Sequence, residues 1–140
     1  GPFDKRYTPS LIKIIDQLNI SHLCEWKGWI NDEEKLSLLN ECQALIIASL
    51  WEGFGLPALE AMACGTPVIA SERGSLPEVL GDYGYFVNPF DSQSIACAMS
   101  AVIKDKKCFE NALEAGPRRA ASYNWPETAR VIENIIKKIE

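Results

Sequence analysis

Two carboxylates flank a glycine-rich turn, in a segment whose residue types and spacing could form a ligand-binding site. The chain reads SLWEGFGLPALEAM over residues 49–62, which places Glu52 before two glycines and Glu60 eight positions later. Glycines let the backbone turn sharply and let a ligand approach closely. Glu60 is a carboxylate in an otherwise apolar helical segment, where burial without a partner is costly.

The residues between the two carboxylates predict the start of a helix. Pro57 fits the first helical turn, where its missing N–H costs nothing. A helix that begins after Gly55 has free N–H groups and a positive dipole end, so it favours anions. Each feature alone also fits an ordinary turn or a solvated side chain, and only their combination indicates a binding site.

The same residues leave a second interpretation open. Gly53, Gly55 and Ala58 match the dinucleotide-binding fingerprint G-x-G-x-x-G/A, and Glu72 follows the next predicted strand about 20 residues later. Against this interpretation, three residues separate Ser49 from Gly53, whereas the fingerprint follows its strand directly. On pattern alone, a dinucleotide-dependent oxidoreductase domain remains an alternative.

The elements that must position these residues alternate between helix and strand. Apolar periodicity predicts strands at 23–27, 44–49, 68–71 and 85–88, separated by helices, with a final pair of helices at 106–122 and 124–139. The continuous apolar run 44–49 is typical of a strand buried on both faces. This order predicts an α/β fold with a parallel sheet and helices on both faces. Such sheets bind ligands outside the carboxyl ends of their strands, which is where Glu52 falls.

Composition restricts the classes of function. The 140 residues fit one domain, and a net charge of -5 without a basic run argues against nucleic acid as a partner. Five scattered cysteines without a CxxC pair indicate a reducing compartment rather than a disulfide framework or a zinc site. The sequence shows no apolar stretch long enough to span a membrane and no signal pattern, so we expect a cytoplasmic protein.

The central segment resembles a known signature. Residues 52–70, EGFGLPALEAMACGTPVIA, are similar to the E-x7-E signature of the group 1 (family 4) retaining glycosyltransferases, with Glu52 and Glu60 as its two glutamates. Further similarity to this family lies in WKGWI at 26–30, LPEV at 76–79, GYFVNP at 84–89 and YNW at 123–125.

The resemblance implies a GT-B fold, in which two Rossmann-like domains face each other across a cleft. Residues 1–140 would form the C-terminal, nucleotide-sugar-binding domain. We expect that domain to be incomplete at its N-terminus, because the family's diphosphate-binding cations precede the segment that starts at Gly1. The acceptor domain would also lie outside this chain, so we expect these residues alone to be inactive.

The resemblance also implies a role for each site residue. Glu52 would be catalytic and would bind hydroxyls of the transferred sugar, and Glu60 would bind the ribose hydroxyls. The remaining donor-binding residues would be Gly53, Phe54, Gly55 and Leu56 at the sugar and diphosphate, and Gly28, Trp29 and Ile30 near the nucleobase. We expect no cofactor and no metal, and the lack of an Asp-x-Asp motif agrees with this expectation.

The implied partners are a donor such as a UDP- or GDP-sugar and an acceptor glycan, lipid or small molecule held by the N-terminal domain. Peripheral association of the full-length protein with the cytoplasmic face of a membrane is left open. Besides the oxidoreductase domain, a non-catalytic module that binds sugar nucleotides is the second alternative to a glycosyltransferase.

Overall fold

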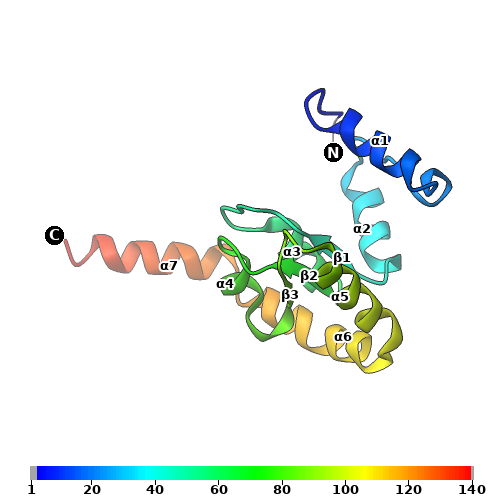
Figure 1. The fold of residues 1–140 in the computed structure, drawn as a ribbon. Helices are drawn as coiled ribbons and strands as arrows, with labels where there is room; N and C mark the ends of the chain where they lie inside the picture. Colours follow the sequence, from blue (N-terminus) through cyan, green and yellow to red (C-terminus); the bar gives the residue numbers. More distant parts are fainter. Residues whose placement is uncertain (1–2, 140) are drawn as a thin grey trace. The chain divides into compact units, whose positions relative to one another are not determined.

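The computed structural model describes residues 3–139, and the chain divides into an N-terminal unit, residues 1–35, and a C-terminal unit, residues 36–140. Figure 1 traces the elements along the sequence. The helices are α1 (Thr8–Gln17), α2 (Asp32–Glu41), α3 (Leu56–Ala63), α4 (Leu76–Leu80), α5 (Ser92–Lys104), α6 (Lys106–Ala121) and α7 (Trp125–Ile136). The strands are β1 (Leu45–Ile47), β2 (Val68–Ser71) and β3 (Tyr85–Val87). The boundary between the units falls within α2.

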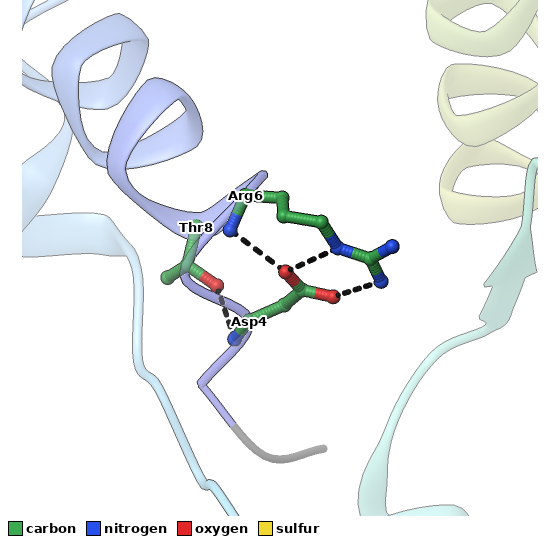
Figure 2. A network of polar contacts seen from close by, with 3 residues as sticks. All are labelled: Asp4, Arg6 and Thr8. Carbon is green, nitrogen blue, oxygen red and sulfur yellow. Dashed lines mark hydrogen bonds and ion pairs between the residues drawn. The ribbon is translucent and has the colours of Figure 1, made fainter.

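In the N-terminal unit, a small polar network joins the first residue of α1 to the segment before it (Figure 2). The backbone N–H of Asp4 donates to Thr8 Oγ1 at 3.0 Å, and the backbone N–H of Arg6 donates to Asp4 Oδ1 at 2.8 Å. The Arg6 guanidinium also binds the Asp4 carboxylate, and this hydrogen bond holds the pKa of Asp4 below its ordinary value. Helix α1 begins at Thr8 with Pro9 in its first turn, and the network fixes the chain as it enters this turn.

The predicted strand at 23–27 is wrong. A short 3-10 helix covers Ser21–Leu23, and the chain that follows is irregular, although Cys24 has extended backbone angles. A strand needs a hydrogen-bonded neighbour to be stable. The described part of the N-terminal unit contains no other strand for this segment to pair with.

The C-terminal unit contains a three-stranded sheet in the order β1-β2-β3. Both pairs are parallel, with Ile46 opposite Ile69 in the first pair and Ala70 opposite Phe86 in the second. Parallel neighbours need crossover helices, and α3 connects β1 to β2. The predicted α/β fold with a parallel sheet is therefore confirmed, and the carboxyl ends of the three strands meet at one edge.

Strand β2 lies at the centre of the core, because every one of its residues is buried. Val68 and Ala70 belong to a cluster that includes residues of α3 and α4. Ile69 points to the other face and belongs to a second cluster with Val102 of α5 and Cys108 of α6. Helices thus cover both faces of the sheet at β2, as the sequence predicts.

Strand β1 differs from its prediction. It is shorter than the run 44–49, and Ile46 keeps 40% of its surface exposed, so the strand is not buried on both faces. The strand order explains this. Ile46 shares a face with Ile69, but β1 lies at the edge of the sheet, and Ile46 is not among the residues packed against the cluster that contains Val102.

Side-chain oxygens cap the starts of α2, α5 and α7. The side-chain oxygens of Asn31, Asp91 and Asn124 accept hydrogen bonds from the backbone N–H groups two or three residues later, at 2.8–2.9 Å. Such caps satisfy N–H groups that have no partner within the helix. All five cysteines are free thiols. Among residues 3–139, no helix is long and apolar enough to cross a lipid bilayer.

Candidate functional site

The loop between β1 and α3 contains the first predicted glutamate and the glycine-rich turn. Gly55 is the N-cap of α3 and has left-handed backbone angles, φ 93° and ψ 45°. A side chain there would also meet Leu76, because an added Cβ would lie 2.9 Å from Leu76 Cδ2. Pro57 occupies the first turn of α3, as predicted. The N–H of Leu56 therefore lies in the first turn, where a helix provides no acceptor of its own.

Glu52 is half-buried in this loop and is held at two points. Its carboxylate Oε1 accepts a hydrogen bond from Ser49 Oγ at 2.9 Å. Its backbone carbonyl accepts two hydrogen bonds from Ser75, one from the amide at 3.2 Å and one from the hydroxyl at 3.1 Å. The loop that carries Glu52 is thus fixed both through its side chain and through its backbone.

The loop after β2 packs directly against the loop after β1. Gly74 lies so close to Glu52 that an added Cβ would stand 2.6 Å from the Glu52 carbonyl oxygen and 2.9 Å from its amide nitrogen. Ser71, the last residue of β2, donates its hydroxyl to the carbonyl of Ser49 at 2.5 Å. Next to Gly74, the Arg73 guanidinium lies 5.2 Å from the ring centroid of Phe90, in the loop after β3. The three loops at the carboxyl edge therefore form one surface.

Glu60 lies one helical turn after Leu56 and on the same side of α3. It lines a hollow of about 420 Å³ whose other walls are Leu59, Ala63, Pro117, Ala120, Ala121 and Tyr123. Burial, together with the nearby Glu60 carboxylate, raises the pKa of the Cys64 thiol. The carboxylate thus faces a recess with mostly apolar walls at the α3–α6 contact.

A second apolar hollow adjoins the first, because both include Leu59 and Tyr123. Its volume is about 420 Å³, and its lining residues are Phe54, Leu56, Leu59, Tyr123, Asn124, Trp125 and Thr128. It joins the glycine-rich loop to the start of α7. The side chains of the predicted donor-binding residues Phe54 and Leu56 therefore border a concave surface.

The other three predicted site residues lie in the N-terminal unit. Gly28, Trp29 and Ile30 occupy an irregular segment, in which Gly28 has a left-handed φ of 63° and Trp29 is 84% exposed. Their place near a nucleobase stays a prediction. The structure brings together Glu52, Gly53, Phe54, Gly55 and Leu56 at the head of α3, with Glu60 one turn further on.

Sequence reasoning missed the serines that hold Glu52. Ser49 lies two residues after the end of β1, Ser71 is the last residue of β2, and Ser75 is the N-cap of α4. The available signal was a hydroxyl three residues before Glu52. The contact with Ser75 spans 23 residues and depends on how the two strands pair, so no local pattern could indicate it.

The spacing of the glycine loop does not fit dinucleotide binding. In the fingerprint the first glycine follows its strand directly. Here β1 ends at Ile47, and Gly53 lies six residues further along the chain. The loop is long enough to present Glu52 before the turn, which the dinucleotide motif does not require.

Comparisons with known proteins agree with the central motif. Residues 3–119 match the family described as glycosyl transferases group 1. The chain is 35% identical over 135 residues to the MMP alpha-(1->4)-mannosyltransferase of Mycolicibacterium hassiacum, covering 91% of this chain and 33% of that protein.

Two solved structures are similar in fold. One is the C-terminal domain of a glycosyl transferase group 1 family protein, LpcC, from Francisella tularensis. Its TM-score is 0.73 at 33% identity, over 87% of this chain and 64% of that one. The other is Anabaena Alr3699/HepE in complex with UDP and glucose, with a TM-score of 0.79 at 25% identity, over 93% of this chain and 37% of that one. The chain spans about a third of the mannosyltransferase that it matches.

Proposed function

This chain belongs to the group 1 glycosyl transferases, and from that premise we propose that it binds a nucleoside-diphosphate sugar and provides the donor site for sugar transfer with retention of anomeric configuration. The observation that carries the proposal is the arrangement around α3. A fixed carboxylate, Glu52, precedes a helix N-terminus, and a second carboxylate, Glu60, lines a recess one turn after Leu56.

Each part of this arrangement suits one part of a sugar nucleotide. The positive end of α3 and the N–H groups of its first turn favour the diphosphate. A carboxylate can accept hydrogen bonds from two adjacent hydroxyls, which suits Glu60 to the ribose and Glu52 to the sugar. The charge of Glu52 would also favour the positive charge that develops in an oxocarbenium-like transition state.

We assign this chain to the C-terminal domain of a longer, two-domain enzyme, whose other domain binds the acceptor. The length of the related mannosyltransferase and the similarity to the C-terminal domain of LpcC support this assignment. The name of the first relative makes a nucleoside-diphosphate mannose the first donor to test, and the complex of HepE makes UDP-glucose the second.

Binding measurements on the intact protein test the proposal. We expect titration calorimetry to show binding of GDP or UDP, and no binding of NAD. A transferase assay with the corresponding sugar nucleotide should then release the nucleoside diphosphate. Binding of NAD without either nucleoside diphosphate would favour an oxidoreductase domain. Binding of a sugar nucleotide with no transfer to any acceptor would favour a non-catalytic module.

A further inference from the structure

We infer that Ser49 is a positioning residue for Glu52: its hydroxyl holds one oxygen of the catalytic carboxylate, and the Gly74–Ser75 segment holds the backbone beneath it. The inference rests on the proposed role of Glu52 at the sugar. Ser49 would not touch the substrate, and its effect on the reaction would pass through the carboxylate.

The side-chain contact restricts how Glu52 can turn. A glutamate in a loop has several rotamers, and ordering them costs conformational free energy. Ser49 Oγ donates to Glu52 Oε1 at 2.9 Å, which leaves the second carboxylate oxygen, Oε2, available to accept from a ligand. Hydrogen bonds to a charged group are stronger than neutral ones, so this contact selects one orientation before substrate arrives.

Ser49 is itself anchored to the sheet. Its backbone carbonyl accepts the hydroxyl of Ser71, a residue with 0% exposure at the end of β2. The position of Ser49 is therefore set by the neighbouring strand. A hydroxyl on a backbone fixed in this way can orient Glu52 at less entropic cost than one on a mobile backbone.

The backbone of Glu52 is held independently of its side chain. Ser75 donates two hydrogen bonds to the Glu52 carbonyl, and Gly74 approaches so closely that a Cβ would stand 2.6 Å from the same oxygen. Any larger residue at position 74 would push the loops apart. The left-handed φ of 61° at Gly74 adds a second reason for glycine at this position.

A double-mutant cycle on the intact enzyme tests the inference. Ser49→Ala should lower kcat about 10-fold to 100-fold, the range for losing a hydrogen bond to a charged group. Donor KM and nucleoside diphosphate affinity should change little, because these contacts are made elsewhere. Ser49→Thr keeps the hydroxyl and should retain most of kcat. In a Glu52→Ala background, Ser49→Ala should cause no further loss, since the group it orients is gone.

Ser21→Ala is the matched control, because Ser21 Oγ also donates to a carboxylate, Asp16 Oδ1, at 2.6 Å in the N-terminal unit. It should leave kcat unchanged. If Glu52→Ala impairs kcat while Ser49→Ala does not, or if the two losses simply multiply, the positioning role of Ser49 is refuted and the proposed function stands. A normal kcat in Glu52→Ala would refute both the role of Glu52 and the role of Ser49.

Gly74→Ala provides a second measurement that does not alter Ser49 or Glu52. It should lower kcat by displacing the Glu52 backbone, and Ser75→Ala, which keeps the amide hydrogen bond, should have a smaller effect. Equal kcat in wild type and Gly74→Ala, at equal melting temperature, would contradict the backbone part of the inference.

Discussion

The rings of Phe54 and Tyr123 meet edge to face, with centroids 5.7 Å apart and planes at 87°. Tyr123 is held in turn by Arg119, which lies over its ring at 5.5 Å, and its hydroxyl donates to the carbonyl of Glu78 at 3.1 Å. The glycine-rich loop is thus anchored through Phe54 to the junction of α6 and α7. The N–H groups that we assign to the diphosphate start from a fixed backbone, which lowers the entropic cost of binding.

Glu52→Gln keeps the size of the side chain and removes its charge. Because that charge acts mainly on the transition state, we expect kcat of the intact enzyme to fall roughly 10²–10³-fold, the scale for losing one preorganised electrostatic group. Nucleoside diphosphate affinity should change little, since Glu52 is assigned to the sugar. Steady-state kinetics and product-binding calorimetry check both statements. A collapse of product affinity together with kcat would show that Glu52 contacts the nucleotide instead.

Glu60→Gln tests the assignment to the ribose. The ribose contact is made equally in the ground state and the transition state, so donor KM should rise more than kcat falls. The loss in donor binding should be about 1.5–3 kcal/mol, the range for charge-assisted hydrogen bonds. Donor KM and nucleoside diphosphate affinity measured on the same variant provide the test. An unchanged donor KM would remove Glu60 from the donor site.

We expect the transfer reaction to be independent of metal ions. The chain lacks an Asp-x-Asp motif, and the N-terminus of α3 supplies positive potential where the diphosphate would bind. Activity of the intact enzyme should therefore survive excess EDTA. Loss of activity that added magnesium or manganese restores would contradict this prediction.

The two glycines of the loop should respond differently to alanine. Gly55 has a left-handed φ of 93° and an added Cβ would lie 2.9 Å from Leu76, so Gly55→Ala should destabilise the fold by about 1–3 kcal/mol. Gly53 has nothing within 4 Å of an added Cβ and no left-handed φ, so Gly53→Ala should change the free energy of unfolding by less than about 0.5 kcal/mol. Urea denaturation of the two variants measures the difference. Equal destabilisation would show that the loop has a different conformation in solution.

The raised pKa values of two tyrosines predict that the protein loses stability at alkaline pH. Burial raises the pKa of Tyr83 above its ordinary value of 10, and burial with a hydrogen bond to Cys108 raises the pKa of Tyr85 to about 12. Folding therefore favours the protonated phenols. This contribution is fully present below pH 10, the ordinary value, and is lost as the pH rises toward the folded-state pKa values.

Urea midpoints measured between about pH 9 and 11.5 test the tyrosine prediction. The midpoint of the wild type should fall more steeply with pH than that of a Tyr83→Phe, Tyr85→Phe double variant. The variant should start lower, because it loses the 2.7 Å hydrogen bond from the Tyr83 hydroxyl to the Thr66 carbonyl. Parallel slopes for the two proteins would assign the alkaline loss to other groups.

Local signals in the sequence predicted much of the C-terminal unit. Pro57 acts within the first turn of α3, so the start of this helix can be predicted from the order of residues along the chain. The pair Glu52 and Glu60 came from a motif within one segment. Their presence on one loop and its following helix is therefore confirmed, and their chemical roles stay predictions.

Features that depend on distant neighbours were not predictable in the same way. The segment 23–27 has strand-like residues, but the described part of its unit contains no strand for it to pair with, and Ile46 is apolar but lies on an edge strand. The hydrogen bond from Ser75 to the Glu52 carbonyl depends on the pairing of β1 with β2, which no pattern along the chain reveals.

The position of β2 in both core clusters has a consequence for how the C-terminal unit opens. β2 is hydrogen-bonded to a strand on each side, and its residues alternate between the two faces of the sheet. If either α3 and α4 on one face or α5 and α6 on the other detached, part of this strand would be exposed to water. Local fluctuations can therefore start at α7 or at the rim of β1, but release of β2 requires both layers at once. The amides of β2 should then exchange their hydrogens only through global unfolding, and Ser71, the anchor of the Glu52 loop, is part of that slowest segment.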